Sequence, residues 1–241
     1  MASPRHAAGG IAHLLRQFDV VDAAPEEASS RRLPVVERGA PAPGSLAALL
    51  ERVAGDDASL VELDLSDNAI FQVSAAAHTR ALAEGLAGNT TLVSLSLDGC
   101  EIADTEGLVL ADALARNVSL TALSVRRNML RASTVEAFAD SLASNSRSAL
   151  RVLELGDQRG SGRIGERVVH AFRRLFETNV VLCRVGGWQL EIQHVNQLQP
   201  FFSRNCEIER RRLLGKRSDE LMPPALKSEA QLLVEQVQSS L

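Results

Sequence analysis

A glycine-rich stretch, GSGRIG at residues 160–165, has the G-x-G-x-x-G spacing that binds dinucleotide phosphates. It follows the apolar run Leu150–Leu155 and precedes GERVVHAFRRLF, which has the pattern of a helix. In a dinucleotide-binding loop the first glycine directly follows the strand, and an acidic residue follows the second strand. Here Gly160 stands several residues beyond Leu155, and the nearest acidic candidate, Glu191, follows a degraded strand. We therefore predict a long inter-repeat loop and no dinucleotide cofactor.

The remaining reactive side chains form no catalytic constellation. None of the five histidines is paired with a second histidine or a cysteine at metal-ligand spacing, and no G-x-S-x-G nucleophile elbow occurs. The three cysteines, Cys100, Cys183 and Cys206, lie far apart without a C-x-x-C pair, so we predict no zinc site and no disulfide framework. We expect no catalytic, cofactor-binding or metal-binding residue, no small-molecule substrate and no enzymatic activity. Free thiols are typical of a reducing compartment, which predicts a cytoplasmic protein.

Composition argues against two further classes of partner. The 241 residues carry a formal net charge of −4, include no tyrosine, and are only 3% aromatic. A nucleic-acid-binding protein normally has a basic surplus and aromatic platforms for the bases. No apolar run approaches the ~20 residues that span a bilayer. We therefore expect neither nucleic-acid nor membrane binding, and a core built from aliphatic side chains.

The elements that position these side chains come from an internal repeat of roughly 30 residues. Each unit has aliphatic residues at positions 1, 4 and 6 and a small polar residue at position 9, which is the leucine-rich repeat pattern. A fifth, degraded unit begins at Leu182 with LCRVGGWQL. The four clear units are Leu60–Ile70 (LVELDLSDNAI), Leu92–Ile102 (LVSLSLDGCEI), Leu120–Leu130 (LTALSVRRNML) and Leu150–Arg159 (LRVLELGDQR).

Position 9 predicts a buried polar ladder. Positions 4 and 6 point to one side of a short strand, and position 9 turns the chain. Its side chain can then pair with backbone groups that the turn leaves without partners. The residues at this position are Asn68, Cys100, Asn128 and Gln158.

Helical patterns separate the strands. We expect Asp104 and Ser133 to be N-caps. We also expect each helix to end at an asparagine in the left-handed conformation, at Asn89, Asn117, Asn145, Asn179 and Asn205. The predicted helices are Ala75–Ala87, Thr105–Ala115, Thr134–Ala143, Glu166–Phe176 and Ile192–Phe202.

Together these patterns predict an α/β leucine-rich repeat solenoid, with parallel strands on the inner curve and helices outside. We place the repeat domain at 44–217, beginning with the helix Ser45–Ala54. Residues 1–43 form an N-terminal tail with an amphipathic piece, Ile11–Val21, that is suited to covering the first repeat. Residues 218–241 form a C-terminal tail with one helical pattern at 225–237.

Functional residues are then expected on surfaces. Positions 3, 5 and 7 face the inner curve, where charged side chains either bind a partner of complementary charge or are simply solvated. Trp188, the only tryptophan, plugs the open end of the solenoid or serves as a binding hot spot. The candidate protein-binding residues are Arg126, Arg127, Glu154, Asp157, Arg159, Trp188, Arg210, Arg211 and Arg212.

The last two repeats resemble the C-terminal leucine-rich repeat domain of tropomodulins and leiomodins. The likeness extends over roughly Ser45–Arg217 and is most specific in LRVLELGDQRG, HAFRRLFETN, VVLCRVG and SRNCEIERRRLLGKR. The residues that carry the likeness are Asp157, Gln158, Arg159, Arg184, Val185, Gly186, Arg204, Asn205 and Arg210–Arg212.

Members of that family cap or nucleate actin filaments, so the resemblance implies a surface that contacts actin and a cytoskeletal location. The family's long N-terminal region is not matched, because only a short segment with the linker-like GAPAPG precedes the repeats. The leading hypothesis is a non-enzymatic protein-interaction scaffold with actin as partner. The alternatives are a regulator of a small GTPase through an exposed arginine, Arg126 or Arg127, and a general adaptor unrelated to actin.

Overall fold

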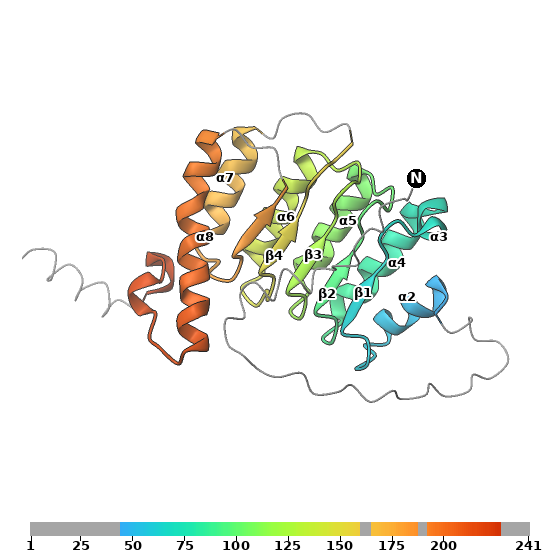
Figure 1. The fold of residues 1–241 in the computed structure, drawn as a ribbon, viewed down its shortest axis with the longest axis horizontal. Coiled ribbons are helices and arrows are strands. Elements are labelled where there is room, and N and C mark those ends of the chain that lie inside the picture. The colour runs from blue at the N-terminus through green and yellow to red at the C-terminus, as the bar shows by residue number, and fades with distance from the viewer. Residues whose placement is uncertain (1–43, 160–164, 188–191, 228–241) are drawn as a thin grey trace, which may run out of the picture.

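The computed structural model describes residues 44–159, 165–187 and 192–227, and it contains one parallel sheet with helices packed against it (Figure 1). The five strands lie side by side in chain order, β1-β2-β3-β4-β5. Each begins two residues after the first leucine of its repeat, as the pattern predicts. The strands are β1 (Glu62–Asp64), β2 (Ser94–Ser96), β3 (Ala122–Ser124), β4 (Val152–Glu154) and β5 (Arg184–Gly186).

Every strand pairs with the next in one register, so equivalent repeat positions lie side by side across the sheet. The central residue of each strand points into the core and is buried, because position 4 faces the helices. These residues are Leu63, Leu95, Leu123, Leu153 and Val185. The leucine-rich repeat solenoid predicted from the sequence is therefore confirmed, including the degraded fifth unit as β5.

Helices follow the strands and cover one face of the sheet (Figure 1). Two helical features differ from prediction: a short helix, α3, lies between β1 and α4, and α8 continues past Phe202, with Pro200 inside it. The described part of the predicted helix at 225–237 is a 3-10 turn. The helices are α2 (Leu46–Ala54), α3 (Ala69–Val73), α4 (Ala75–Gly88), α5 (Asp104–Leu114), α6 (Ala132–Ser144), α7 (Glu166–Leu175) and α8 (Ile192–Leu213), with 3-10 turns η1 (Asp219–Leu221) and η2 (Pro224–Leu226).

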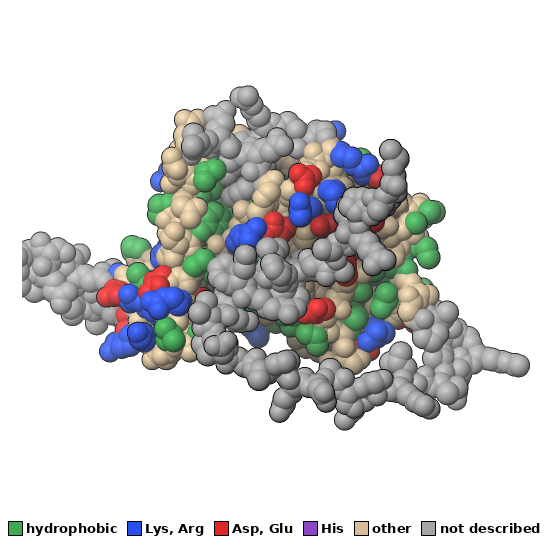
Figure 2. Space-filling model, viewed as in Figure 1, with side chains coloured by type: hydrophobic (Ala, Val, Ile, Leu, Met, Phe, Trp, Pro, Cys, Tyr) green, Lys and Arg blue, Asp and Glu red, His purple; other side chains and the backbone are tan. Residues whose placement is uncertain are grey.

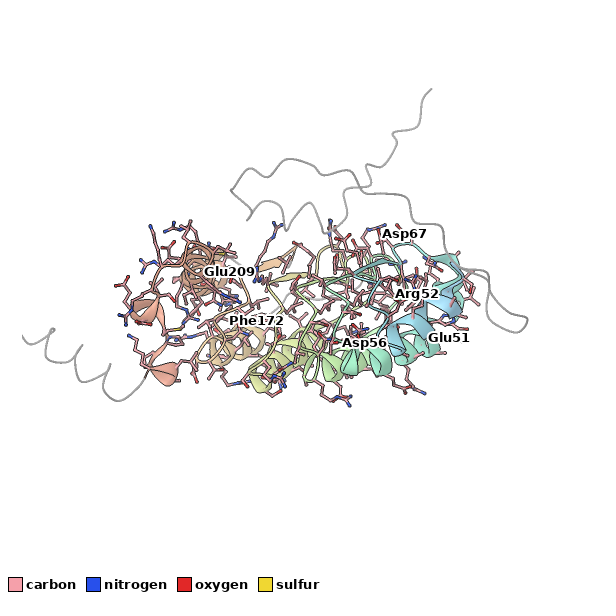
Figure 3. All side chains as sticks on the ribbon, turned by 90° about the horizontal axis from the view of Figure 1, so that it is seen from below. Glu51, Arg52, Asp56, Asp67, Phe172 and Glu209 are labelled. Atoms are coloured by element: carbon pink, nitrogen blue, oxygen red, sulfur yellow. The ribbon has the colours of Figure 1, made fainter. Side chains whose placement is uncertain are left out.

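Aliphatic side chains fill the space between strands and helices, and phenylalanines complete it. Phe138 and Phe172 are fully buried under the outer helices. At the last repeat, Phe176 stacks on Phe201 with 5.2 Å between ring centroids and meets Phe202 edge-on at 5.0 Å. These ring contacts attach α8 to the end of the array, so α8 closes the core of the terminal repeat. Viewed from below, Arg52 and Glu209 lie near opposite ends of the array (Figure 3).

The two predicted N-caps are wrong. The extended residue before α5 is Ala103, and Asp104 is the first residue of that helix. Its carboxylate accepts hydrogen bonds from the Thr134 hydroxyl and from the Arg131 backbone N–H, 3.0 Å away. Ser133 lies within α6 and donates its hydroxyl to the same carboxylate. Asp104 therefore caps the next helix rather than its own, and a pattern confined to one repeat does not reveal this.

The asparagines after the helices are also not left-handed. Asn89 is extended at φ −71°, and Asn145 has φ −97°. They form a second buried ladder instead: Asn117 donates to the carbonyl oxygens of Leu86 and Asn89 at 2.7 and 3.2 Å. Asn145 repeats this geometry one unit later, on the Asn117 carbonyl at 2.7 Å. Each asparagine thus supplies a hydrogen-bond donor to carbonyl groups that have no partner within the preceding repeat's helix.

Asn205, predicted to end a helix, lies inside α8 and completes this second ladder. Its amide donates to the Leu182 carbonyl at 2.9 Å. The neighbouring Arg204 donates to the carbonyl oxygens of Phe176 and Asn179 at 3.1 and 2.9 Å. Arg204 thereby takes the place that an asparagine of a sixth repeat would occupy. Because Arg204 and Asn205 bind these carbonyl groups, α8 extends past the boundary predicted from its own periodicity.

Among the described residues, no helix is both long enough and apolar enough to cross a bilayer. The predicted N-terminal piece at 11–21 lies outside the described residues, as does most of GSGRIG. The last glycine of that stretch, Gly165, is the extended residue before α7. The division into a tail, a repeat domain at 44–217 and a second tail stays a prediction.

Candidate interaction surface

The ladder at position 9 supports the loops that follow the strands. Asn128 is fully buried, and its amide nitrogen donates to the carbonyl oxygens of Leu97 and Val125 at 2.8 and 2.9 Å. Its side-chain oxygen accepts from the Ile102 N–H at 3.1 Å. Gln158 repeats the arrangement in the next unit, with a bond to the Val125 carbonyl at 2.8 Å. The predicted ladder is therefore present in the third and fourth repeats.

The other two rungs are weaker or different. Cys100 donates its thiol to the Leu65 carbonyl at 3.0 Å, in the same place as the Asn128 amide. Asn68 instead caps α3, accepting from the Phe71 N–H at 2.9 Å. The first repeat departs from the pattern because the short helix α3 begins directly after Asn68.

A left-handed residue at position 8 of each clear repeat sharpens the turn just before this ladder. The φ angles are 54° at Asp67, 63° at Gly99, 55° at Arg127 and 58° at Asp157. The sequence pattern does not reveal this conformation, since of the four residues only Gly99 lacks the Cβ atom that disfavours the left-handed region. The conformation points the side chains of Arg127 and Asp157 outward, at the rim where the strands end.

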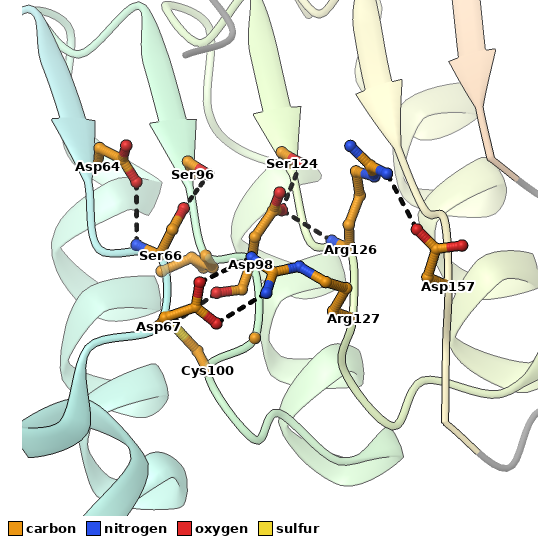
Figure 4. Close-up of polar contacts among 12 residues, drawn as sticks. Asp64, Ser66, Asp67, Ser96, Asp98, Cys100, Ser124, Arg126, Arg127 and Asp157 are labelled. Carbon is orange, nitrogen blue, oxygen red and sulfur yellow. Dashed lines mark hydrogen bonds and ion pairs between the residues drawn. The ribbon is translucent and has the colours of Figure 1, made fainter. Parts of the chain in front are cut away.

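Charged residues gather at this rim, and we call them the strand-end cluster. Arg127 reaches across Gly99 to form two hydrogen bonds with Asp67, at 2.9 and 2.8 Å (Figure 4). A Cβ atom at Gly99 would lie 2.2 Å from the Asp67 carboxylate, so the glycine leaves the space for this contact. The bonds to Asp67 raise the pKa of Arg127. The cluster consists of Asp67, Asp98, Glu101, Arg126, Arg127, Asp157 and Arg159.

The other two arginines of the strand-end cluster are paired as well. Arg126 donates to Asp157 at 2.9 Å, and Arg159 pairs with Glu101 across two repeats at 2.5 Å. Asp98 accepts from the Arg126 N–H at 2.9 Å. Four of the predicted protein-binding residues are thus brought together, but each engages an opposite charge within the chain. The strand-end cluster is therefore a nearly neutral network of ion pairs rather than a free basic patch.

The inner face of the strands is less open than expected. Positions 3 and 5 were expected to face the inner curve, and in β1 the side chains of Glu62 and Asp64 are exposed. In β2, β3 and β4 the same positions are buried, including Ala122 and Val152, which form a small apolar cluster of their own. The accessible charges of this region lie at position 7 and beyond, in the strand-end cluster.

Glu154 is a candidate contact residue that is buried on this face, with only 5% of its surface exposed. Its carboxylate lies 3.0 Å from the Arg184 guanidinium and above Gly186, where a Cβ would come within 1.9 Å of it. Burial raises the pKa of Glu154, although Arg184 and Arg126 oppose the shift. The buried Glu154 carboxylate can influence a partner only through its ion pair with Arg184. A side chain at position 186 would displace the carboxylate.

We expect Glu154→Gln to gain stability relative to the wild type as the pH rises from 4 to 7. In the unfolded chain the carboxyl ionises near its ordinary pKa of 4.5, whereas the folded chain keeps the proton to higher pH. The folded state therefore binds more protons between the two pKa values, and wild-type stability falls with rising pH there. Each unit by which the folded pKa is raised corresponds to about 1.4 kcal/mol.

Urea unfolding of the wild type and Glu154→Gln across this pH range measures the difference. Glu62→Gln, which changes an exposed glutamate of β1, is the matched control. If the difference between Glu154→Gln and the wild type stays constant over the range, the assigned direction of the Glu154 pKa is wrong.

A second charged surface lies at the C-terminal part of α8, and we call it the α8 basic end (Figure 2). Arg210 and Arg211 both pair with Glu207 at 2.7 Å. Arg212 is 75% exposed at its side chain and approaches Glu209 only at 3.7 Å. The surface comprises Arg210, Arg211, Arg212, Lys216 and Arg217, with Glu207, Glu209, Asp219 and Glu220 among them.

Glu209 is already engaged by Arg151, at 2.8 Å. Arg212 and Lys216 are therefore the cations of the α8 basic end that are most available to a partner. Trp188, the remaining candidate, lies outside the described residues. Within the ranges that the structure describes, no group of three or more histidine, cysteine, aspartate or glutamate side chains is arranged to hold a metal ion.

Comparisons with known proteins agree with this geometry. A model of the Leucine Rich repeat family matches residues 88–110, which include β2 and the start of α5. No curated protein matches the chain significantly. The tropomodulin C-terminal domain of Caenorhabditis elegans is similar in structure, with a TM-score of 0.63 and 23% identity, over 71% of this chain and 99% of that domain.

A structure titled "Leiomodin-1 Actin-Binding Site 2 (ABS2)" is similar to the same degree. Its TM-score is 0.63 at 21% identity, over 72% of this chain and 96% of that chain. At these identities the likeness establishes the fold. The resemblance to the tropomodulin and leiomodin repeat domain, seen in the sequence of the last two repeats, is therefore confirmed at the level of architecture.

Proposed function

We propose that this chain is a non-enzymatic protein-interaction scaffold and that actin is its partner. The observation that carries the proposal is the match over nearly the whole length of two repeat domains, one of which is titled an actin-binding site. The solenoid supports this role, because its repeats bury a continuous aliphatic core and leave rigid charged surfaces at the rim and at α8. Such surfaces suit recognition of a large partner.

The α8 basic end is the surface that we assign to an acidic partner. The arginines of the strand-end cluster are held by internal carboxylates, and a partner would have to break those pairs before binding them. Arg212 and Lys216 are both exposed, and Arg212 has only a long contact, 3.7 Å, with Glu209 to give up. Long-range attraction between such loosely held cations and an acidic surface raises the association rate and fixes orientation.

Co-sedimentation with actin filaments and a pointed-end elongation assay test the proposal. We expect Arg212→Glu to weaken filament binding about tenfold, because it reverses an exposed charge of the α8 basic end whose carboxylate neighbour, Glu209, is 3.7 Å away. Arg173→Glu, which changes an exposed arginine on the outer side of α7, is the matched control and should change affinity less than twofold. Equal losses in both variants would refute the assigned surface.

Failure of the wild-type chain to bind actin in both assays would remove actin and leave a general adaptor. The GTPase-regulator alternative depends on an exposed arginine acting as a finger in a partner's site. Arg126 and Arg127 would first have to leave Asp157 and Asp67. A panel of small GTPases tests this alternative, since it requires accelerated hydrolysis that Arg127→Ala abolishes.

A further inference from the structure

Two of the three cysteines meet where β5 joins α8, although they are well separated in the sequence. Cys183 immediately precedes β5, and Cys206 lies in α8. The Cys206 thiol donates to the Cys183 carbonyl oxygen at 3.6 Å, and the Cys183 thiol donates to the nearby Val181 carbonyl at 3.3 Å. Cys100 lies three repeats away from them, after β2, and is buried against the Leu65 carbonyl. The chain therefore contains one thiol pair and one isolated thiol.

The backbone on both sides of the thiol pair is fixed by the second ladder. The residue before Cys206, Asn205, donates to the carbonyl of the residue before Cys183, Leu182, at 2.9 Å. On the same helix, Glu209 forms an ion pair with Arg151 at 2.8 Å. These contacts hold the two cysteines together in the folded chain, so their proximity does not depend on side-chain rotation alone.

The two thiols differ in reactivity. Cys183 is buried, whereas Cys206 is partly exposed. The neighbouring Cys183 side chain lowers the pKa of Cys206. The interaction with Cys206, together with burial, raises the pKa of Cys183. The thiolate therefore forms at the sulfur that solvent reaches, which is the arrangement that favours attack on an oxidant.

We propose that Cys183 and Cys206 are a redox modification site, at which a peroxide oxidises the pair to an intramolecular disulfide. The Cys206 thiolate attacks one peroxide oxygen, the O–O bond breaks, and Cys206 sulfenic acid and hydroxide form; the hydroxide becomes water with the proton that the Cys206 thiol released. The Cys183 sulfur then attacks the sulfenic sulfur. The S–S bond forms, and the hydroxyl group leaves as water with the Cys183 proton. The two thiols supply the two electrons, and a dithiol reductant reverses the reaction.

The disulfide would attach α8 covalently to the last strand. This helix carries Arg204 and Asn205, which complete the second ladder, and it ends in the α8 basic end. Oxidation would therefore fix the terminal repeat and the orientation of those arginines at the same time. Closing a loop of roughly 20 residues predicts a rise in Tm of about 5–10 °C in the oxidised chain.

The test treats the full, reduced chain with one equivalent of hydrogen peroxide and analyses it by mass spectrometry. We expect a mass about 2 Da lower, the loss of two of the three titratable thiols, and a non-reduced peptide that links Cys183 to Cys206. No disulfide between two chains should form during the oxidation, and dithiothreitol should restore all three thiols. These measurements use the wild type and do not depend on a variant that must fold.

Three variants complete the design. Cys100→Ala should form the link as the wild type does, since burial raises the pKa of Cys100 to about 12 and keeps its thiol unreactive. Cys206→Ser should keep its remaining thiols reduced. Cys183→Ser should leave Cys206 as a sulfenic acid that dimedone traps. Three free thiols after treatment of the wild type, a link through Cys100, or only intermolecular links would each overturn the proposal.

Discussion

Replacing Asn128 by alanine is expected to lower the free energy of unfolding by about 3–5 kcal/mol. The substitution removes a fully buried carboxamide that serves three carbonyl oxygens and one N–H of the loops after the strands. Each buried backbone group left without a partner costs roughly 1–3 kcal/mol. Water cannot replace the carboxamide easily, because aliphatic side chains of two repeats surround it. Urea unfolding followed by circular dichroism measures the change.

The control for Asn128→Ala is the same substitution one repeat earlier. Cys100→Ala removes a thiol whose short contact is with the Leu65 carbonyl, at 3.0 Å. A thiol is a weak donor, so we expect a loss of only about 1–2 kcal/mol. Asn128→Asp keeps the shape of the side chain but replaces the donor by a carboxylate facing carbonyl oxygens, and it should be nearly as harmful as alanine. Equal losses at Asn128 and Cys100 would show that cavity formation, rather than the ladder, dominates.

Much of this fold follows from features that one repeat displays alone. The aliphatic residues at positions 1, 4 and 6 predict the strands and their inward face, since burial on a strand has period two. The polar residue at position 9 predicts the ladder that Asn128 and Gln158 form. These predictions succeed because each depends on local geometry and on the near-identity of neighbouring repeats.

The predictions that failed concern contacts between repeats. Asp104 looks like the cap of its own helix, yet it binds Ser133 and Thr134 of the next. A short sequence pattern does not state which carboxylate faces which helix end, and the spacing of roughly 30 residues between the partners lies outside any local motif. The thiol pair of Cys183 and Cys206 was missed for the same reason.

The candidate interaction surface, too, can be predicted from the sequence only in part. Arg126, Arg127, Asp157 and Arg159 are neighbours in repeat register, so their grouping at the rim follows from the pattern. Their mutual neutralisation does not, because it depends on Arg127 crossing over Gly99 to an aspartate two repeats away. Only the three-dimensional arrangement shows which cations are already paired.

The second large effect is expected for Gly187→Ala, at the end of β5. Gly187 has φ +74°, and an added Cβ would lie 2.3 Å from the Gly156 Cα and 2.6 Å from its nitrogen. Both neighbours are backbone atoms of β4's exit, so no side chain can move to make room. The left-handed strain and the backbone clash together predict a loss of about 3 kcal/mol or more in the free energy of unfolding.

Two other glycines separate the clash from the general effect of adding a methyl group. Gly88→Ala places a Cβ at the end of α4 with nothing within 4 Å, and it should stabilise the chain by up to about 1 kcal/mol. Gly186→Ala would meet the Glu154 carboxylate at 1.9 Å, but a carboxylate can rotate away. We therefore expect a smaller loss there, about 1–2 kcal/mol, from exposing a buried group.

The position of Gly187 in the last repeat also predicts where its effect appears. In a solenoid each repeat is stabilised by its neighbours, so a defect in the terminal unit releases that unit before the rest. Hydrogen exchange of Gly187→Ala should show lost protection at the amides of Arg184–Gly186 and in α8, with β2 and β3 protected as in the wild type. Asn128→Ala, at the centre of the array, should instead lower protection across all five strands. Uniform loss in Gly187→Ala would mean that the terminal repeat unfolds only with the whole domain, and that the contacts of Arg204 and Asn205 bind it as firmly as any internal repeat.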